Sequence, residues 1–156
     1  MCYIKVNTKT FYEQFDWSYI TMFLGVASDL EIQNVLNYVD VAFSEENEIH
    51  RAFDSHILEC LIQIYSYVDY EQSILVFHLI CQIFNVIDSS QLEIYITEEL
   101  RSILNTHIQF TSRKIRVEMF QLLCRMIDIC QRTDIYKADL EELANKLYEE
   151  IPLSED

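Results

Sequence analysis

Residues 76–84 read VFHLICQIF, and residues 119–127, which lie 43 positions later, read MFQLLCRMI. Both segments are apolar at nearly every position, so each predicts a helix that is buried on almost all sides. The spacing continues outside these segments, because Ile57 falls on Leu100 and then on Leu143. Helical periodicity alone can align two buried helices by chance, but it does not explain one offset shared by both helices of a pair. We therefore interpret the chain as an internal repeat of helix pairs.

The composition favours helices as well. The chain has 156 residues, is 51% hydrophobic, and contains ten Tyr, nine Phe, one Trp, one Gly and one Pro. Such scarcity of Gly and Pro excludes most tight hairpins, phosphate-binding loops and Rossmann turns. A chain of this length is one ordinary domain that needs no metal or disulfide to fold. We expect a single all-α domain over residues 1–156 with roughly seven or eight helices.

Capping residues place the helices in the first half of the chain. Ser28 is expected to cap a helix that ends near Phe43. The acidic residues after Ser44 favour the start of the next helix, which the apolar pattern continues to about Val68. Asp69 is the expected cap of the following, buried helix. Residues 1–27 are expected to form an N-terminal cap of one or two helices.

Similar signals place the later helices. Residues 90–93 read SQLE, which is a capping-box pattern and predicts the start of a helix that contains Leu100. Ser112 is the expected cap of the next, mostly apolar helix. A final amphipathic helix is expected to stop at Pro152, and residues 152–156 are expected to form a frayed acidic tail.

The cysteines indicate a reducing compartment. The chain has five cysteines, an odd number, and no Cys-x-x-Cys pair, which argues against a disulfide framework and a zinc ribbon. Cys60, Cys81 and Cys124 lie among apolar residues at helical spacing and are expected in the core. Without a signal-peptide pattern, or an apolar stretch long enough to span a bilayer, we expect no membrane insertion and a cytoplasmic location, with the nucleus as the alternative.

Residues 115–123 read IRVEMFQLL, which is similar to the second helix of a HEAT repeat. With the repeat spacing, the chain resembles the HEAT and armadillo families over residues 28–151. That resemblance implies a superhelix of stacked antiparallel helix pairs and, by family habit, a protein-binding scaffold; it does not identify a partner. The chain departs from the families in having Ser73 where the next repeat has Arg116, and in lacking their Pro and Gly positions.

Charge is the main functional clue. The chain carries 11 Lys and Arg against 26 Asp and Glu, for a net charge of −15. Residues 41–100 hold one basic and 11 acidic groups, whereas residues 101–132 hold six basic and two acidic groups. The basic residues of the second segment are Arg101, Arg113, Lys114, Arg116, Arg125 and Arg132. They either pair with neighbouring acidic helices, or Arg113, Lys114 and Arg116 bind an anion or an acidic peptide at a helix start.

The acidic part of the chain suggests a basic partner protein or peptide. Tyrosines near predicted turns, next to acidic groups, are typical of interface residues. The predicted partner-binding residues are Glu45, Glu46, Glu48, Tyr67, Tyr70 and Glu71. An ordinary solvated face is the alternative interpretation of the acids, and filling of gaps between repeats is the alternative for the tyrosines. A homo-oligomer is left open.

No catalytic motif is present in the sequence, so we expect no enzyme, cofactor or metal. Glu46, His50 and Asp54 share one helix face, which we interpret as a solvated acidic face rather than a metal site. His78 and His107 are expected to be packed residues rather than bases. The predicted function is a protein-binding adaptor or scaffold that does not bind DNA or RNA directly, because its field repels phosphate. The alternative is an acidic inhibitor or nucleic-acid mimic that occupies a basic groove.

Overall fold

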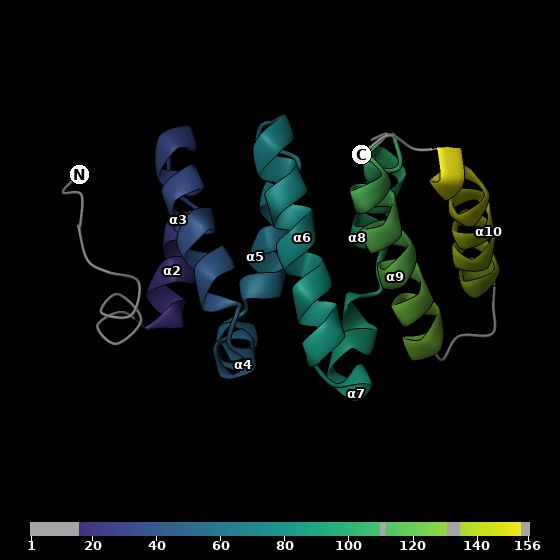
Figure 1. The fold of residues 1–156 in the computed structure, drawn as a ribbon. Helices are drawn as coiled ribbons and strands as arrows, with labels where there is room; N and C mark the ends of the chain where they lie inside the picture. The colour runs from purple at the N-terminus through teal and green to yellow at the C-terminus, as the bar shows by residue number, and fades with distance from the viewer. Residues whose placement is uncertain (1–15, 110–111, 131–134, 154–156) are drawn as a thin grey trace. The chain divides into compact units, whose positions relative to one another are not determined.

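The computed structural model describes residues 16–109, 112–130 and 135–153. Over these residues the chain forms nine α-helices and two short 3-10 helices without any β-strand, which confirms the predicted all-α class (Figure 1). The contacts gather into two compact units, residues 1–86 (unit 1) and 87–156 (unit 2). The predicted single domain over residues 1–156 stays a prediction. None of the described helices has the length and apolar character needed to cross a membrane.

Unit 1 consists of two helical hairpins and a short connecting helix. Its helices are α2 (Trp17–Leu24), α3 (Asp29–Ala42), α4 (Glu46–Asp54), α5 (Ile57–Ile64) and α6 (Tyr70–Val86). Helices α2 and α3 form the first hairpin, and α5 and α6 the second; α2 packs on α5 and α3 packs on α6. The core includes Leu36, Val39, Leu58 and Phe77, which are completely or almost completely buried.

Side-chain caps begin the two longest helices of unit 1 where the sequence predicts. The Glu31 carboxylate accepts a hydrogen bond from the Ser28 backbone N–H at 3.0 Å, completing a capping box at the start of α3. At the start of α6, Asp69 Oδ1 accepts from the Gln72 N–H at 2.8 Å, and Gln72 Oε1 accepts from the Asp69 N–H at 3.3 Å. These bonds satisfy backbone donors that a helix start leaves unpaired.

The predicted helix from Ser44 to Val68 is wrong, because the chain breaks between α4 and α5. His56 there has a φ of 66°, and no other non-glycine residue of the described part has a positive φ. A residue with a Cβ loses roughly 1–2 kcal/mol in this left-handed conformation, although His tolerates it better than branched residues do. The apolar spacing runs through the break from Phe53 to Ile57, so the pattern alone gave no sign of it.

The left-handed conformation predicts an unusual order of stabilities at position 56. His56→Val should lower the free energy of unfolding by about 1 kcal/mol or more relative to His56→Gly, because only glycine adopts this conformation without a steric cost. Urea denaturation of both variants measures the difference. The control is His50, an exposed residue inside α4. There the order should reverse, because valine is the better helix former. If the Val and Gly variants had the same order of stability at positions 56 and 50, the left-handed break at His56 would be contradicted.

Unit 2 contains α7 (Ser89–Leu92), η1 (Glu93–Tyr95), α8 (Glu98–His107), α9 (Arg113–Ile129), α10 (Ile135–Glu150) and η2 (Ile151–Leu153). Helices α9 and α10 pack against each other. They run antiparallel, because Arg116 near the start of α9 bonds Glu150 at the end of α10 at 3.0 Å. Phe120 and Tyr148 form a tilted ring contact at 5.5 Å between the same helices.

The predicted start of a helix at residues 90–93 is also wrong. Ser90 lies inside the four-residue α7, which is followed by a 3-10 turn. The helix that contains Leu100 begins later, where Thr97 Oγ1 accepts from the Leu100 N–H at 3.4 Å. Glu98 and Glu99 fill its first turn, where acidic side chains interact favourably with the helix dipole. The Thr97 cap therefore replaces the predicted one. The other predicted cap, Ser112, does precede α9.

The helix bounds are compatible with a 43-residue helical repeat. Helix α6 spans Tyr70–Val86 and α9 spans Arg113–Ile129, so both ends are displaced by 43 residues. The helices that precede or follow them, α5, α8 and α10, end at Ile64, His107 and Glu150, again 43 residues apart. The offset in the sequence is thus also an offset in secondary structure.

Residues 43 positions apart on α6 and α9 are buried alike on one face of these helices but differently on another. Val76 and Met119, which are 43 residues apart, are both completely buried. Cys60 and Cys81 are buried as expected, but Cys124, the counterpart of Cys81, is exposed, so its predicted core position is wrong. The stripe of α9 that carries Cys124 also carries Phe120, which is only half-buried against Tyr148.

His107 is packed in the core of unit 2, as predicted, with no exposed surface. Burial disfavours the charged imidazolium and lowers the pKa of His107 to about 3 from its ordinary value of 6.5. The folded state therefore holds the neutral ring at a pH where the unfolded chain already takes up a proton.

This lowered pKa predicts an acid-sensitive stability. Because the folded pKa lies below the unfolded one, the contribution of His107 is complete above pH 6.5 and is lost as the pH falls from 6.5 towards about 3. Between pH 7 and pH 5 the wild type should lose about 2 kcal/mol of unfolding free energy that His107→Leu does not lose. Urea titrations at both pH values measure it. His50→Leu, at an exposed position, should retain the wild-type pH dependence. Equal pH dependence in His107→Leu and the wild type would contradict this role of His107.

Candidate functional site

The six predicted partner-binding residues all lie in unit 1, but at opposite ends of it. Glu45 and Glu46 are exposed at the start of α4, directly after α3 ends. Tyr67 lies in the connection between α5 and α6, and Tyr70 and Glu71 begin α6. Figure 1 shows α4 at the lower end of unit 1, away from that connection.

The distance between the two groups follows from α3. Gln72, in the first turn of α6, donates from Nε2 to the Asp29 carbonyl at 3.1 Å, so α6 and α3 begin side by side. Helix α3 has 14 residues and is therefore about 21 Å long. Because Glu45 follows the end of α3 and Tyr70 adjoins its start, these residues do not form one patch.

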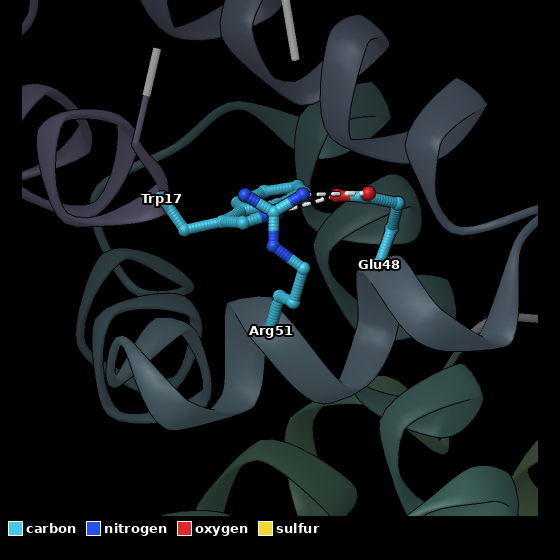
Figure 2. A network of polar contacts seen from close by, with 3 residues as sticks. All are labelled: Trp17, Glu48 and Arg51. Atoms are coloured by element: carbon cyan, nitrogen blue, oxygen red, sulfur yellow. Dashed lines mark hydrogen bonds and ion pairs between the residues drawn. The ribbon is translucent and has the colours of Figure 1, made fainter. Parts of the chain in front are cut away.

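Glu48 has a structural role that the sequence did not indicate. Its carboxylate accepts a hydrogen bond from Trp17 Nε1 at 2.8 Å and pairs with Arg51 at 2.8 Å (Figure 2). The Glu48 side chain is 13% exposed, and Trp17 as a residue is 2% exposed. The Trp17 ring also lies 6.0 Å from that of Phe43. Glu48 thus ties α4 to α2, and its carboxylate is already occupied.

Removing this carboxylate should destabilise unit 1. Glu48→Ala leaves the buried Trp17 N–H without its acceptor, and we expect a loss of about 1–3 kcal/mol in unfolding free energy. Glu48→Gln retains an acceptor oxygen for Trp17 but loses the negative charge that strengthens this bond and the partly exposed ion pair with Arg51, so its loss should be smaller, about 1 kcal/mol. Thermal and urea unfolding with Trp17 fluorescence measure both. Glu46→Ala, at an exposed position in the same helix, is the control and should change stability little. A Glu48→Ala variant as stable as Glu46→Ala would contradict the assignment.

At the other end of unit 1, the predicted residues Tyr67 and Tyr70 lie near two further exposed apolar residues, Val26 and Leu30. Tyr67 and Tyr70 are 82% and 61% exposed, and Val26 and Leu30 are 80% and 65% exposed. Val26 lies in the α2–α3 connection and Leu30 in the first turn of α3. We name Val26, Leu30, Tyr67 and Tyr70 the turn-end surface. Leu30 was not among the residues predicted from the sequence. A signal was present, because Leu30 lies two residues before the buried Ile32 and so falls outside the apolar stripe of that helix.

The described part of unit 1 is almost free of basic side chains. Residues 16–86 contain eleven Asp and Glu but a single Lys or Arg, which is Arg51. Because Arg51 is paired with Glu48, the surface of these residues has little positive charge to offset its carboxylates. Asp29 and Glu71 are exposed next to the turn-end surface. The starts of α3 and α6 account in part for these two acids, since helix N-termini favour negative charge.

The basic residues of unit 2 divide into paired and exposed groups. Arg101 bonds Asp139 at 2.9 Å, and Arg116, whose side chain is 14% exposed, bonds Glu150. For these two, pairing with neighbouring acidic helices is confirmed. Arg125 donates to the Ile87 carbonyl at 3.2 Å. Arg132 lies outside the described residues. The use of Arg116 in an ion pair leaves two exposed side chains, Arg113 and Lys114, for the predicted anion contact, which stays a prediction.

The titratable groups of the described residues include candidate metal ligands and candidate nucleophiles. Glu46, His50 and Asp54 are all exposed on α4. Across residues 16–109, 112–130 and 135–153, no three His, Cys, Asp or Glu side chains are placed to hold a metal ion. Burial and the neighbouring Glu59 raise the pKa of the Cys60 thiol, and partial desolvation and Asp128 raise the pKa of the Cys124 thiol. A raised pKa favours the protonated thiol, which is the less nucleophilic form.

Comparisons with known proteins add no family. The sequence matches no family model, and neither a curated protein nor a solved structure is significantly similar to it.

Proposed function

We propose that this chain is a non-enzymatic protein-interaction module, an adaptor or scaffold, that binds a basic partner protein through the acidic surface of unit 1. One observation carries the proposal: residues 16–86 hold eleven acidic side chains, and their single basic residue, Arg51, is paired with Glu48. A surface of one sign attracts partners of the opposite sign and speeds their association. The same field repels the phosphates of DNA and RNA.

We further propose that the helix pairs continue into a HEAT- or armadillo-like superhelix. The proposal is supported by the 43-residue displacement of α6 to α9 and by the common spacing of the ends of α5, α8 and α10. In unit 1 the like helices of the two hairpins pack on each other, α2 on α5 and α3 on α6, which is how repeat proteins bury the apolar face of each pair. Arrays of this kind present extended surfaces to other proteins.

The near absence of cations in residues 16–86 also favours a second candidate, an acidic inhibitor or nucleic-acid mimic. A surface with carboxylates and hardly any Lys or Arg resembles a phosphate backbone to a basic groove. The two candidates differ in the partner. A mimic is displaced by the nucleic acid that it imitates, whereas an adaptor binds in its presence.

Neutralising exposed acids tests both candidates. In the first variant three exposed acids from both ends of unit 1, Glu45, Asp54 and Glu71, become Gln, Asn and Gln; in the matched control Glu141, Glu142 and Glu149, exposed on α10, become Gln. Affinity purification and mass spectrometry identify partners, and titration calorimetry of the purified partner over a range of salt concentrations gives affinities.

We expect the unit 1 variant to bind several-fold more weakly and with a smaller salt dependence, and the control to bind like the wild type. Equal losses in both variants, or a partner whose binding does not depend on salt, would contradict a docking role for unit 1. Release of the partner by competing DNA would favour the mimic.

A further inference from the structure

We infer that the turn-end surface, Val26, Leu30, Tyr67 and Tyr70, is the place where a partner segment docks, and that this segment carries apolar side chains flanked by Lys or Arg. The inference rests on the proposed function, because it names the surface and the chemistry through which unit 1 would bind a basic protein. The inference requires three conditions. The four side chains must lie close together, the stability of the fold must not account for their exposure, and the charges around them must favour a positively charged partner.

The four side chains lie at one end of unit 1, because its two hairpins run in the same direction. Cys60 Sγ donates to the Thr21 carbonyl at 3.3 Å and pairs the middle of α5 with the middle of α2. The bond from Gln72 to Asp29 pairs the start of α6 with the start of α3. The α2–α3 and α5–α6 connections are therefore neighbours at the same end. Adjacent packed helices lie about 8–10 Å apart, so the surface is roughly one helix spacing across.

Folding does not explain the exposure of these side chains, because the chain buries similar residues next to them. Tyr65 is 7% exposed, whereas Tyr67, two residues later, is 82% exposed. Ile32 is 8% exposed, whereas Leu30, two residues earlier, is 65% exposed. A single exposed apolar residue is ordinary, but several over two adjacent turns form a patch of the kind that marks an interaction site. Tyrosine is also among the residues that dominate binding energy at interfaces.

The charges around the surface select a positive partner. Asp29 and Glu71 are exposed beside Leu30 and Tyr70 in the chain. The nearest basic residue in sequence among residues 16–86 is Arg51, which lies on α4 at the other end of the unit and is held by Glu48. An apolar patch with an acidic rim, beside which residues 16–86 place no Lys or Arg, fits a segment whose apolar anchors are flanked by Lys or Arg, and it disfavours acidic segments.

The size of the surface limits the partner segment and its affinity. Two anchors about 10 Å apart are presented by residues seven apart on an α-helix, which share one helix face. Such a contact is smaller than a standard protein interface, so a short segment alone should bind with a dissociation constant on the order of 10 μM to 1 mM.

A synthetic peptide pair tests the inference on the full chain. The probe is a fluorescent helical peptide of about 14 residues with Leu on one face and Arg on the other, and the control peptide has Ser in place of every Leu. Fluorescence anisotropy at about 0.15 M salt gives affinities, and backbone amide NMR shifts locate the contact. We expect the Leu/Arg peptide to bind at least about tenfold more tightly than the Ser/Arg peptide, with shifts gathered in the α2–α3 and α5–α6 connections.

Variants of the chain separate the anchors from general charge. Tyr67→Ala and Leu30→Ser should each weaken the Leu/Arg peptide at least about fivefold, and Tyr67→Phe, which retains the ring, should stay within about twofold of the wild type. Ile94→Ser is the matched control, because Ile94 is 75% exposed but lies in unit 2. It should bind like the wild type. Because the substituted positions are exposed, all four variants should keep the wild-type unfolding midpoint.

The inference is overturned if the Leu/Arg peptide does not bind, if both peptides bind equally, if the shifts gather at α4 instead, or if Tyr67→Ala and Leu30→Ser bind like Ile94→Ser. The proposed function fails separately. Should neutralisation of Glu45, Asp54 and Glu71 weaken the binding of a natural partner while Tyr67→Ala leaves it unchanged, the docking surface is wrong and the acidic interaction module stands.

Discussion

The side chain of Gln72 holds the arrangement on which the turn-end surface depends. It is a polar side chain with only 4% exposure, and such a group is costly to bury unless it is hydrogen-bonded. Its amide nitrogen donates to the Asp29 carbonyl, and its amide oxygen accepts from the Asp69 N–H. One buried amide therefore caps α6 and at the same time fixes α6 beside the start of α3. The equivalent position 43 residues later is Ile115, so this link belongs to unit 1 and is not a general feature of the repeat.

The sequence was sufficient wherever a signal is local. The Ser28 and Asp69 caps depend on side chains within three residues, and both are present. The 43-residue offset depends on apolar spacing, and the bounds of α6 and α9 follow it. Prediction from the sequence failed where two local signals compete or where no local signal exists. Thr97 replaced the expected cap at residues 90–93, and the left-handed His56 interrupts a helix whose apolar pattern continues without a gap.

Charged residues were the hardest to interpret, because their roles depend on tertiary partners. Besides Arg51 on its own helix, Glu48 contacts Trp17, 31 residues away, and Arg116 contacts Glu150, 34 residues away. No spacing rule along one helix connects such pairs, so a structural carboxylate and a docking carboxylate look the same in the sequence. The predicted group of six residues was accordingly divided by the structure, with Glu48 in an internal contact and Tyr67 exposed on a surface.

Exposed apolar residues discriminate better than acids between a docking surface and an ordinary face. An acid at the start of α3 or α6 stabilises the helix that carries it, so Asp29 and Glu71 have a reason to be there with or without a partner. Because Leu30 and Tyr67 bury little of their apolar surface, they contribute little to the stability of the fold. Each exposed apolar side chain also makes the surface more prone to unwanted association. The surrounding negative charge counters that tendency by repelling other copies of the chain. In the docking that we propose, the same charge favours a partner that brings Lys or Arg, so that acids and apolar anchors together would provide the selectivity that neither provides alone.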